Sequence, residues 1–81
     1  MHGEVMTFEK GEKIFILYDK GTVAGEVVLA SPNSVSLMLK FEAMIGNHVG
    51  MMPVLQENKQ LSTYRSIIDG TTVIVQKREL Y

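Results

Sequence analysis

Two histidines carry the most versatile side-chain chemistry in this sequence, which contains no cysteine. A serine hydrolase needs a histidine held between a serine and an aspartate, and nothing in the sequence places His2 or His48 beside such a pair. A zinc site needs three or four ligands at ordered spacing, which two isolated histidines do not supply. We therefore expect both histidines to be exposed polar residues. We also expect no catalytic residues, no metal, no cofactor and no enzymatic activity.

Phosphate and nucleic-acid chemistry receive little support from the composition. The glycine-flanked stretch 46–50 lacks the Gly-Lys-Ser/Thr ending of a phosphate-binding loop. The chain carries a net charge of −1 and has a pI of about 6.1, whereas a basic nucleic-acid-binding domain usually has a pI above about 9. The lysines and arginines are also scattered along the chain, so any phosphate contact would have to come from a local patch.

The chain is short and unusually apolar, with 81 residues of which 46% are hydrophobic. A domain of this size buries only about 60–65% of its unfolded surface, so its core alone is marginal. We therefore expect self-association, with part of the apolar surface facing a neighbouring subunit. The longest apolar run, residues 14–18, is far below the roughly 20 residues of a membrane-spanning helix, and residues 1–5 contain no secretory signal pattern. These features predict a cytoplasmic protein with no membrane partner.

Valine, isoleucine and threonine total 20 residues against three alanines, a composition typical of β-sheet proteins. Strands are predicted over 13–18, 22–30, 35–41, 61–68 and 71–76, and a type I turn over 31–34. Gly25 lies inside a strand, which indicates a bulge, a bend or a close backbone approach. Residues 42–45 either extend the third strand or form a helical turn, and 46–50 are predicted to be a loop. Residues 51–55 could add an edge strand around Pro53.

Five main strands, one of them bent at a glycine, predict an all-β fold of the small closed barrel type. Residues 1–81 form a single domain in this interpretation, with an N-terminal extension over 1–12 and a variable, elaborated loop region over 42–60 between strands three and four. Met38, Met44, Met51 and Met52 make the centre of the chain rich in methionine. This cluster fits either a subunit interface or ordinary core packing, and packing is the simpler interpretation.

Two segments resemble the motifs of the Sm/LSm family. Residues 13–31 combine an apolar strand, a polar-Gly turn and a strand with a central glycine, as in the first Sm motif, and a third strand follows. Residues 66–75 are similar to the short second motif, an apolar strand end, a charged residue plus glycine, and a final apolar strand. The resemblance covers about half the chain. It implies a strongly bent five-stranded antiparallel Sm-like (SH3-like) barrel.

The resemblance also implies an assembly and a site. Members pair the fourth strand of one subunit with the fifth of the next, which here implies a homo-oligomeric ring of about five to seven subunits. Single-stranded RNA, or DNA, would bind at loops around the pore, and the two loops 31–34 and 69–71 would face the same side. The implied nucleic-acid-binding residues are Asn33, Ser34, Ser36, Tyr64, Arg65, Asp69, Gly70 and Thr71.

The family's uridine pocket uses an Asn and an Arg where this chain has Ser36 and Asp69, and a carboxylate at that position repels phosphate. The step 64–66 weakly resembles the Tyr-Lys-His step of the bacterial host factor Hfq but lacks its histidine. Each site residue also has a structural explanation. Loop residues suit turns, Arg65 suits a cross-strand ion pair, and Tyr64 suits the core. The first hypothesis is a non-catalytic nucleic-acid-binding ring. The alternative is an oligomeric protein-interaction or structural module.

Overall fold

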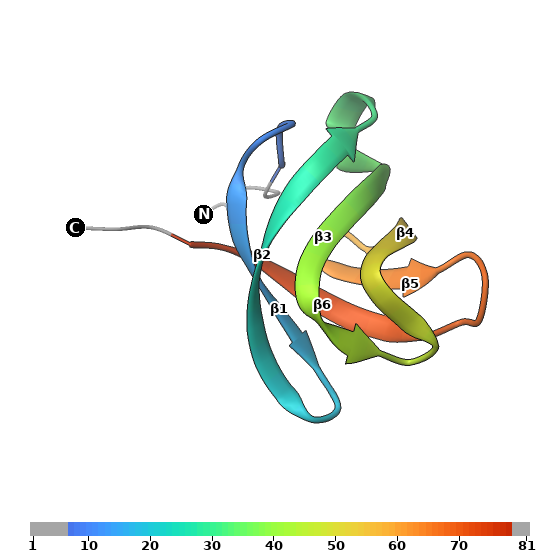
Figure 1. Cartoon of the computed structure of the whole chain (residues 1–81). Coiled ribbons are helices and arrows are strands. Elements are labelled where there is room, and N and C mark those ends of the chain that lie inside the picture. The colour runs from blue at the N-terminus through green and yellow to red at the C-terminus, as the bar shows by residue number, and fades with distance from the viewer. Residues whose placement is uncertain (1–6, 79–81) are drawn as a thin grey trace.

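Six antiparallel strands close into one barrel in which each strand pairs with the next along the chain and β6 returns to β1. The computed structural model describes residues 7–78 (Figure 1). A short 3-10 turn, η1 (Pro32–Ser34), precedes β3. The strands are β1 (Lys13–Tyr18), β2 (Gly21–Ala30), β3 (Ser36–Ile45), β4 (His48–Asn58), β5 (Thr63–Ser66) and β6 (Thr72–Lys77).

The expected all-β closed barrel is confirmed, but the expected number of strands was wrong: residues 7–78 form six, not five. The region 42–60, predicted to be a variable loop, is mostly sheet, because β3 extends to Ile45 and β4 begins at His48. Gly46, with φ of 57°, permits the short turn between them. Pro53 lies opposite Met38 within β4, and its carbonyl accepts a hydrogen bond from the Ile67 N–H. Its missing N–H therefore falls beyond the end of β5, where no ladder bond is lost.

The bend in β2 lets one strand serve both halves of the barrel, as the central glycine predicted. β2 pairs with β1 over Gly21–Glu26 and with β3 from Gly25 onward. A Cβ at Gly25 would lie 2.6 Å from the Lys40 carbonyl oxygen, so the backbones of β2 and β3 approach closely there. Two of the alternatives open for Gly25 are therefore observed, a bend of the strand and a close backbone approach. The bulge lies further along, between Val27 and Leu29.

Two shorter elements also differ from the sequence-based expectation. The strand predicted over 61–68 is confined to Thr63–Ser66, because Ser62 has a φ of 58° and residues 67–69 turn. The turn over 31–34 is not type I, since Asn33 and Ser34 have φ values of 61° and 57°. The φ of 61° and ψ of 17° at Asn33, directly after Pro32, are instead those of position i+2 in a type II turn.

The barrel interior is filled by alternating side chains from all six strands. The buried apolar set is Phe8, Ile14, Ile16, Val27, Leu37, Leu39, Phe41, Ile45, Met52, Val54, Tyr64, Val73 and Val75. Leu29 lies two residues after the buried Val27 but is 55% exposed, because the bulge between them reverses the alternation of the strand. Val35, included in the strand predicted over 35–41, precedes β3 and is exposed. Phe8 shows that the described part of the N-terminal extension packs on the barrel.

Candidate functional site

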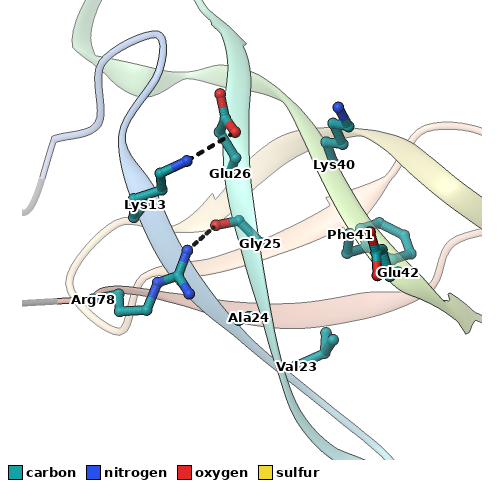
Figure 2. Close-up of a pocket in the computed structure, with 9 residues that line it drawn as sticks. All are labelled: Lys13, Val23, Ala24, Gly25, Glu26, Lys40, Phe41, Glu42 and Arg78. Atoms are coloured by element: carbon teal, nitrogen blue, oxygen red, sulfur yellow. Dashed lines mark hydrogen bonds and ion pairs between the residues drawn. The ribbon is translucent and has the colours of Figure 1, made fainter.

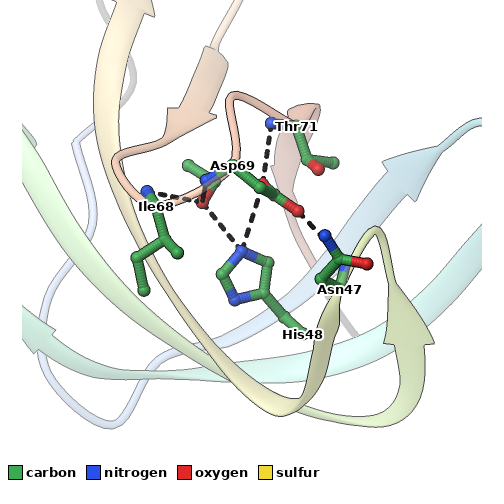
Figure 3. Close-up of polar contacts among 6 residues, drawn as sticks. Asn47, His48, Ile68, Asp69 and Thr71 are labelled. Carbon is green, nitrogen blue, oxygen red and sulfur yellow. Dashed lines mark hydrogen bonds and ion pairs between the residues drawn. The ribbon is translucent and has the colours of Figure 1, made fainter.

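His48 is buried at the start of β4, which corrects the expectation of an exposed loop histidine. Its Nε2 lies 2.8 Å from Ser66 Oγ and 3.2 Å from Asp69 Oδ1 (Figure 3). The short β3–β4 turn brings His48 to the loop between β5 and β6, although 18 residues separate it from Ser66. The structure therefore places a serine, a histidine and an aspartate together. His2 lies outside the described residues.

This cluster does not have the geometry of a nucleophilic triad. In a triad the serine and the aspartate bind opposite ring nitrogens, whereas here both face Nε2. Ser66 is 2% exposed, and its Oγ accepts hydrogen bonds from the N–H groups of Ile68 and Asp69. A substrate carbonyl cannot reach such an oxygen. The cluster instead connects the β3–β4 turn to the β5–β6 loop through hydrogen bonds.

Asp69 is the central hydrogen-bond acceptor in this cluster. Its Oδ1 accepts the Thr71 N–H at 3.0 Å, and its Oδ2 accepts the Asn47 N–H at 3.1 Å. These bonds, led by those from Thr71, hold the pKa of the Asp69 carboxyl well below its usual range. We call Asn47, His48, Ser66, Asp69 and Thr71 the Asp69 network. The charged Asp69 carboxylate lies near the surface but accepts hydrogen bonds from the protein's own N–H groups.

A second polar network lies near η1. The Ser34 Oγ accepts the Phe8 N–H at 2.6 Å and donates to the Phe8 carbonyl at 3.1 Å. The Tyr64 hydroxyl donates to the Ser34 carbonyl at 2.9 Å, and Gln56 donates to the Tyr64 oxygen. Burial raises the pKa of Tyr64 above its ordinary value, against a smaller lowering by Gln56. We call Phe8, Ser34, Gln56 and Tyr64 the Ser34 network.

The loops expected to face the same side lie at opposite ends of the β3–β4 hairpin. Asn33 borders a hollow with Gln56 and Lys59, near the end of β4. Asp69 and Thr71 contact the turn at Asn47, at the other end of the hairpin. In Figure 1, η1 lies at the top of the view and the β3–β4 turn at its lower right. A single-stranded nucleic acid would have to extend across the barrel to contact both loops.

The remaining predicted site residues are held by the fold. Tyr64 is fully buried, so neither face of its ring is open for stacking on a base. Arg65 is exposed but makes two bonds to the Glu57 carboxylate, at 2.8 and 3.2 Å. Ser36 donates its N–H to the Ser31 hydroxyl at the start of β3. Gly70, with φ of 78°, supplies the turn conformation before β6.

Cations also gather where β2 separates from β3, around a cavity of about 500 Å³ (Figure 2). Arg78 donates to the Gly25 carbonyl at 3.2 Å, and Lys13 pairs with Glu26 at 3.2 Å. Glu26 and Lys40 are also cross-strand partners, so carboxylates alternate with the cations. This cavity therefore does not present the uniform positive field that a phosphate backbone requires.

The least expected surface is an apolar row on the outside of the barrel. Met38 lies opposite both Leu29 on β2 and Pro53 on β4, and Ile67 donates its N–H to the Pro53 carbonyl. Leu55 lies two residues beyond Pro53 on β4 and points to the same outer face. We call Leu29, Met38, Pro53, Leu55 and Ile67 the outer apolar row. Leu29, Leu55 and Ile67 are 55%, 46% and 60% exposed.

The row is hollowed on both sides of a ridge. All five of its residues line a hollow of about 370 Å³ over β2, β3 and β4. Leu55 and Ile67 also line a second hollow of about 580 Å³ over β4 and β5, where Arg65 and Glu57 form its polar border. Leu55 and Ile67 therefore stand as a ridge between two depressions. An apolar patch with a polar rim is typical of an interaction surface.

The sequence held a partial signal for this row. Pro53 and Leu55 alternate with the buried Met52 and Val54, so β4 is apolar on both faces. The methionine cluster divides accordingly: Met52 is buried, whereas Met44 and Met51 are exposed and Met38 is half-buried in the row. Leu29 and Ile67 could not be assigned, because a bulge and the early end of β5 bring them to this face.

Comparisons with known proteins add no relative. No protein-family model, no curated protein and no solved structure matches the chain. Within residues 7–78, no helix is long and apolar enough to cross a membrane. Nor do three or more His, Asp or Glu side chains cluster as metal ligands anywhere in that range.

Proposed function

We propose that this chain is a protein-interaction barrel that works by docking its outer apolar row on another protein surface. The observation that carries the proposal is the row itself, five apolar residues contributed by β2, β3, β4 and the β5–β6 loop around one hollow. Water-exposed apolar area of this kind is covered favourably at about 25 cal/mol per Å². The ion pair between Arg65 and Glu57 beside the ridge supplies a polar border.

A protein partner fits this surface better than a lipid surface. Membrane-surface binding by an apolar face is usually assisted by lysines and arginines that attract anionic headgroups. Here Arg65 at the border is paired with Glu57, and Lys40 lies opposite Glu26. Apolar contact surrounded by balanced charge is the pattern of a protein interface.

Methionine oxidation tests the proposal inside the cells that make the protein. Met38 lies in the row, Met44 is 64% exposed at the far end of β3, and Met52 is fully buried. Mild peroxide converts accessible methionines to the sulfoxide, which mass spectrometry quantifies at each position. We expect Met38 to oxidise several-fold more slowly in cells than in the dilute purified chain, relative to Met44. Equal relative rates in cells and in dilution would overturn the proposal.

Nucleic-acid binding, the first hypothesis from the sequence, stays a prediction with its own test. Labelled oligo-U, oligo-A and random single-stranded DNA are titrated with the protein at increasing salt. Phosphate contacts require affinity to fall steeply with salt. Salt-sensitive binding that Arg65→Ala weakens for all three probes would support the nucleic-acid ring. No binding at low salt would leave the interaction barrel as the better explanation.

A further inference from the structure

We infer that the partner of the outer apolar row is a second copy of this chain, docked through a two-fold axis beside Leu55 and Ile67. This inference rests on the proposed function and names the partner of the same surface. In a two-fold interface the same patch serves both subunits, so the patch must be complementary to itself. A ridge beside a hollow meets this requirement, because the axis places each ridge over the other copy's hollow.

The shape of the row supports this arrangement. The ridge formed by Leu55 and Ile67 borders the hollow whose floor includes Met38 and Pro53. A Leu or Ile side chain from a facing copy would cover Met38, Pro53 and Leu29 at once. The reciprocal contact would cover the same residues on the other copy. Methionine adapts to irregular gaps, which suits Met38 to the base of such a hollow.

The pairing of the strands decides which surface two copies can share. β5 already pairs with β4 over Val54–Asn58 and with β6 on its other side. The fourth and fifth strands predicted from the sequence correspond to β5 and β6, and β6 is also paired with β1 on its other side. An Sm-type ring, which would join β5 of one copy to β6 of the next, would therefore have to break existing strand pairs. The outer apolar row requires no broken backbone bond. Docking through side chains is therefore the route that leaves the closed barrel intact.

Size and charge are also consistent with a second copy. A standard interface buries about 800 Å² per partner, a modest share of the 5230 Å² surface of this chain. Exposed apolar area continues from the row onto Met51, which lies two residues before Pro53 on β4 and on the same outer face. With a net charge of −1, two copies approach each other with little repulsion.

Sedimentation velocity over a dilution series tests the inference, with a matched pair of isoleucine variants. Ile67 and Ile68 are adjacent and similarly exposed, at 60% and 70%, but only Ile67 lines the hollows. We expect the wild type and Ile68→Arg to dimerise. Ile67→Arg should weaken dimerisation at least tenfold, because it places an unpaired charge in an apolar contact on both copies. Leu55→Arg should act likewise, and circular dichroism confirms that each barrel is folded.

Cysteine cross-linking tests the geometry, because the chain has no cysteine of its own. A mixture of Met38→Cys and Ile67→Cys should form a mixed disulfide in preference to either self-linked dimer, as the ridge of one copy meets the hollow of the other. A monomeric wild type throughout the dilution series would overturn the inference. So would equal effects of Ile67→Arg and Ile68→Arg. If Met38 stays protected in cells while the purified chain is monomeric, the proposed function survives and only the second copy is excluded.

Discussion

The two ends of the β3–β4 hairpin are closed by polar networks that solve the same problem with different chemistry. At each end a side chain from the β5 segment, Tyr64 or Ser66, binds an element far away in the sequence. The Ser34 network uses hydroxyl and backbone groups that are neutral at ordinary pH. The Asp69 network uses a carboxylate and a histidine. One end is therefore insensitive to acid, while the other depends on a charge.

The two networks also differ in the depth of their central groups, although His48 and Ser66 in the Asp69 network are themselves buried. Ser34 and Tyr64 are almost completely buried, so an unmade bond there would leave a desolvated group without a partner. The Asp69 carboxylate lies near the surface, where water can replace a lost protein bond. Each bond to Ser34 therefore contributes more stability than each bond to the Asp69 carboxylate, whereas the carboxylate fixes the position of a turn and makes that end sensitive to pH.

The largest expected effect comes from Gly46, where the β3–β4 turn contacts the Asp69 network. A Cβ at Gly46 would overlap Thr71 Oγ1 and lie 2.8 Å from Asp69 Oδ2, and the φ of 57° already disfavours alanine. We expect Gly46→Ala to lower the free energy of unfolding by about 3–4 kcal/mol, from backbone strain and overpacking together. Urea denaturation measures this change.

Gly70→Ala is the matched control for Gly46→Ala. Gly70 has a similar positive φ of 78°, but a Cβ there meets nothing within 4 Å. Backbone strain alone should cost about 1–2 kcal/mol. Equal losses from the two variants would show that the turn does not need its close contact with Asp69 and Thr71. The charged network would then not be what holds this end of the hairpin.

The parts of the fold that were predictable depend on local pattern. β1 was predicted with its observed bounds, because five apolar residues run up to the turn at Asp19. The bend of β2 followed from Gly25, since a glycine inside a strand indicates a backbone irregularity or a close backbone approach. Six strands rather than five were missed because Gly46 and Gly50 read as loop residues. In the structure Gly46 forms a tight turn, and Gly50, with φ of 86°, lies within β4.

The polar networks and the apolar row were not predictable from the sequence, because each depends on contacts across the barrel. His48 meets Asp69 only once β3, β4 and β5 are in register. The sequence around Ser34 predicts a turn, and no neighbouring residue indicates that Ser34 binds Phe8, 26 positions away. The row includes Leu29 because of a bulge. Excess apolar composition predicted an exposed apolar surface somewhere, but the fold was needed to locate it.

At the neutral end, Ser34→Ala is expected to have the next largest effect. The substitution leaves the buried N–H and carbonyl of Phe8 without the hydroxyl that both use. We expect a loss of about 2 kcal/mol in the free energy of unfolding, the cost of unsatisfied buried groups. Because neither lost bond involves a charge, this loss should be the same at about pH 4 and pH 8. A loss that varies strongly with pH in this range would contradict the neutral character of this end.

The smallest effect, and the sharpest contrast between the ends, is the response to pH. The folded-state pKa of Asp69 lies below its unfolded value, so the carboxylate stabilises the fold at neutral pH and this contribution fades as the pH falls below about 4. Tyr64 has a raised pKa, so its contribution is lost as the pH rises above about 10. Asp69→Asn should therefore reduce the loss of stability at acid pH, and Tyr64→Phe should reduce the loss of stability at alkaline pH.

Amide chemical shifts test whether the acid response is confined to the Asp69 end of the hairpin. The N–H groups of Asn47 and Thr71 donate to Asp69, whereas that of Phe8 donates to Ser34. In an acid titration followed by NMR, the first two signals should move together with a midpoint below the ordinary Asp value of about 4, and the third should stay in place until the barrel unfolds. If all three moved together, the two ends would be one cooperative unit, and local chemistry would no longer distinguish them.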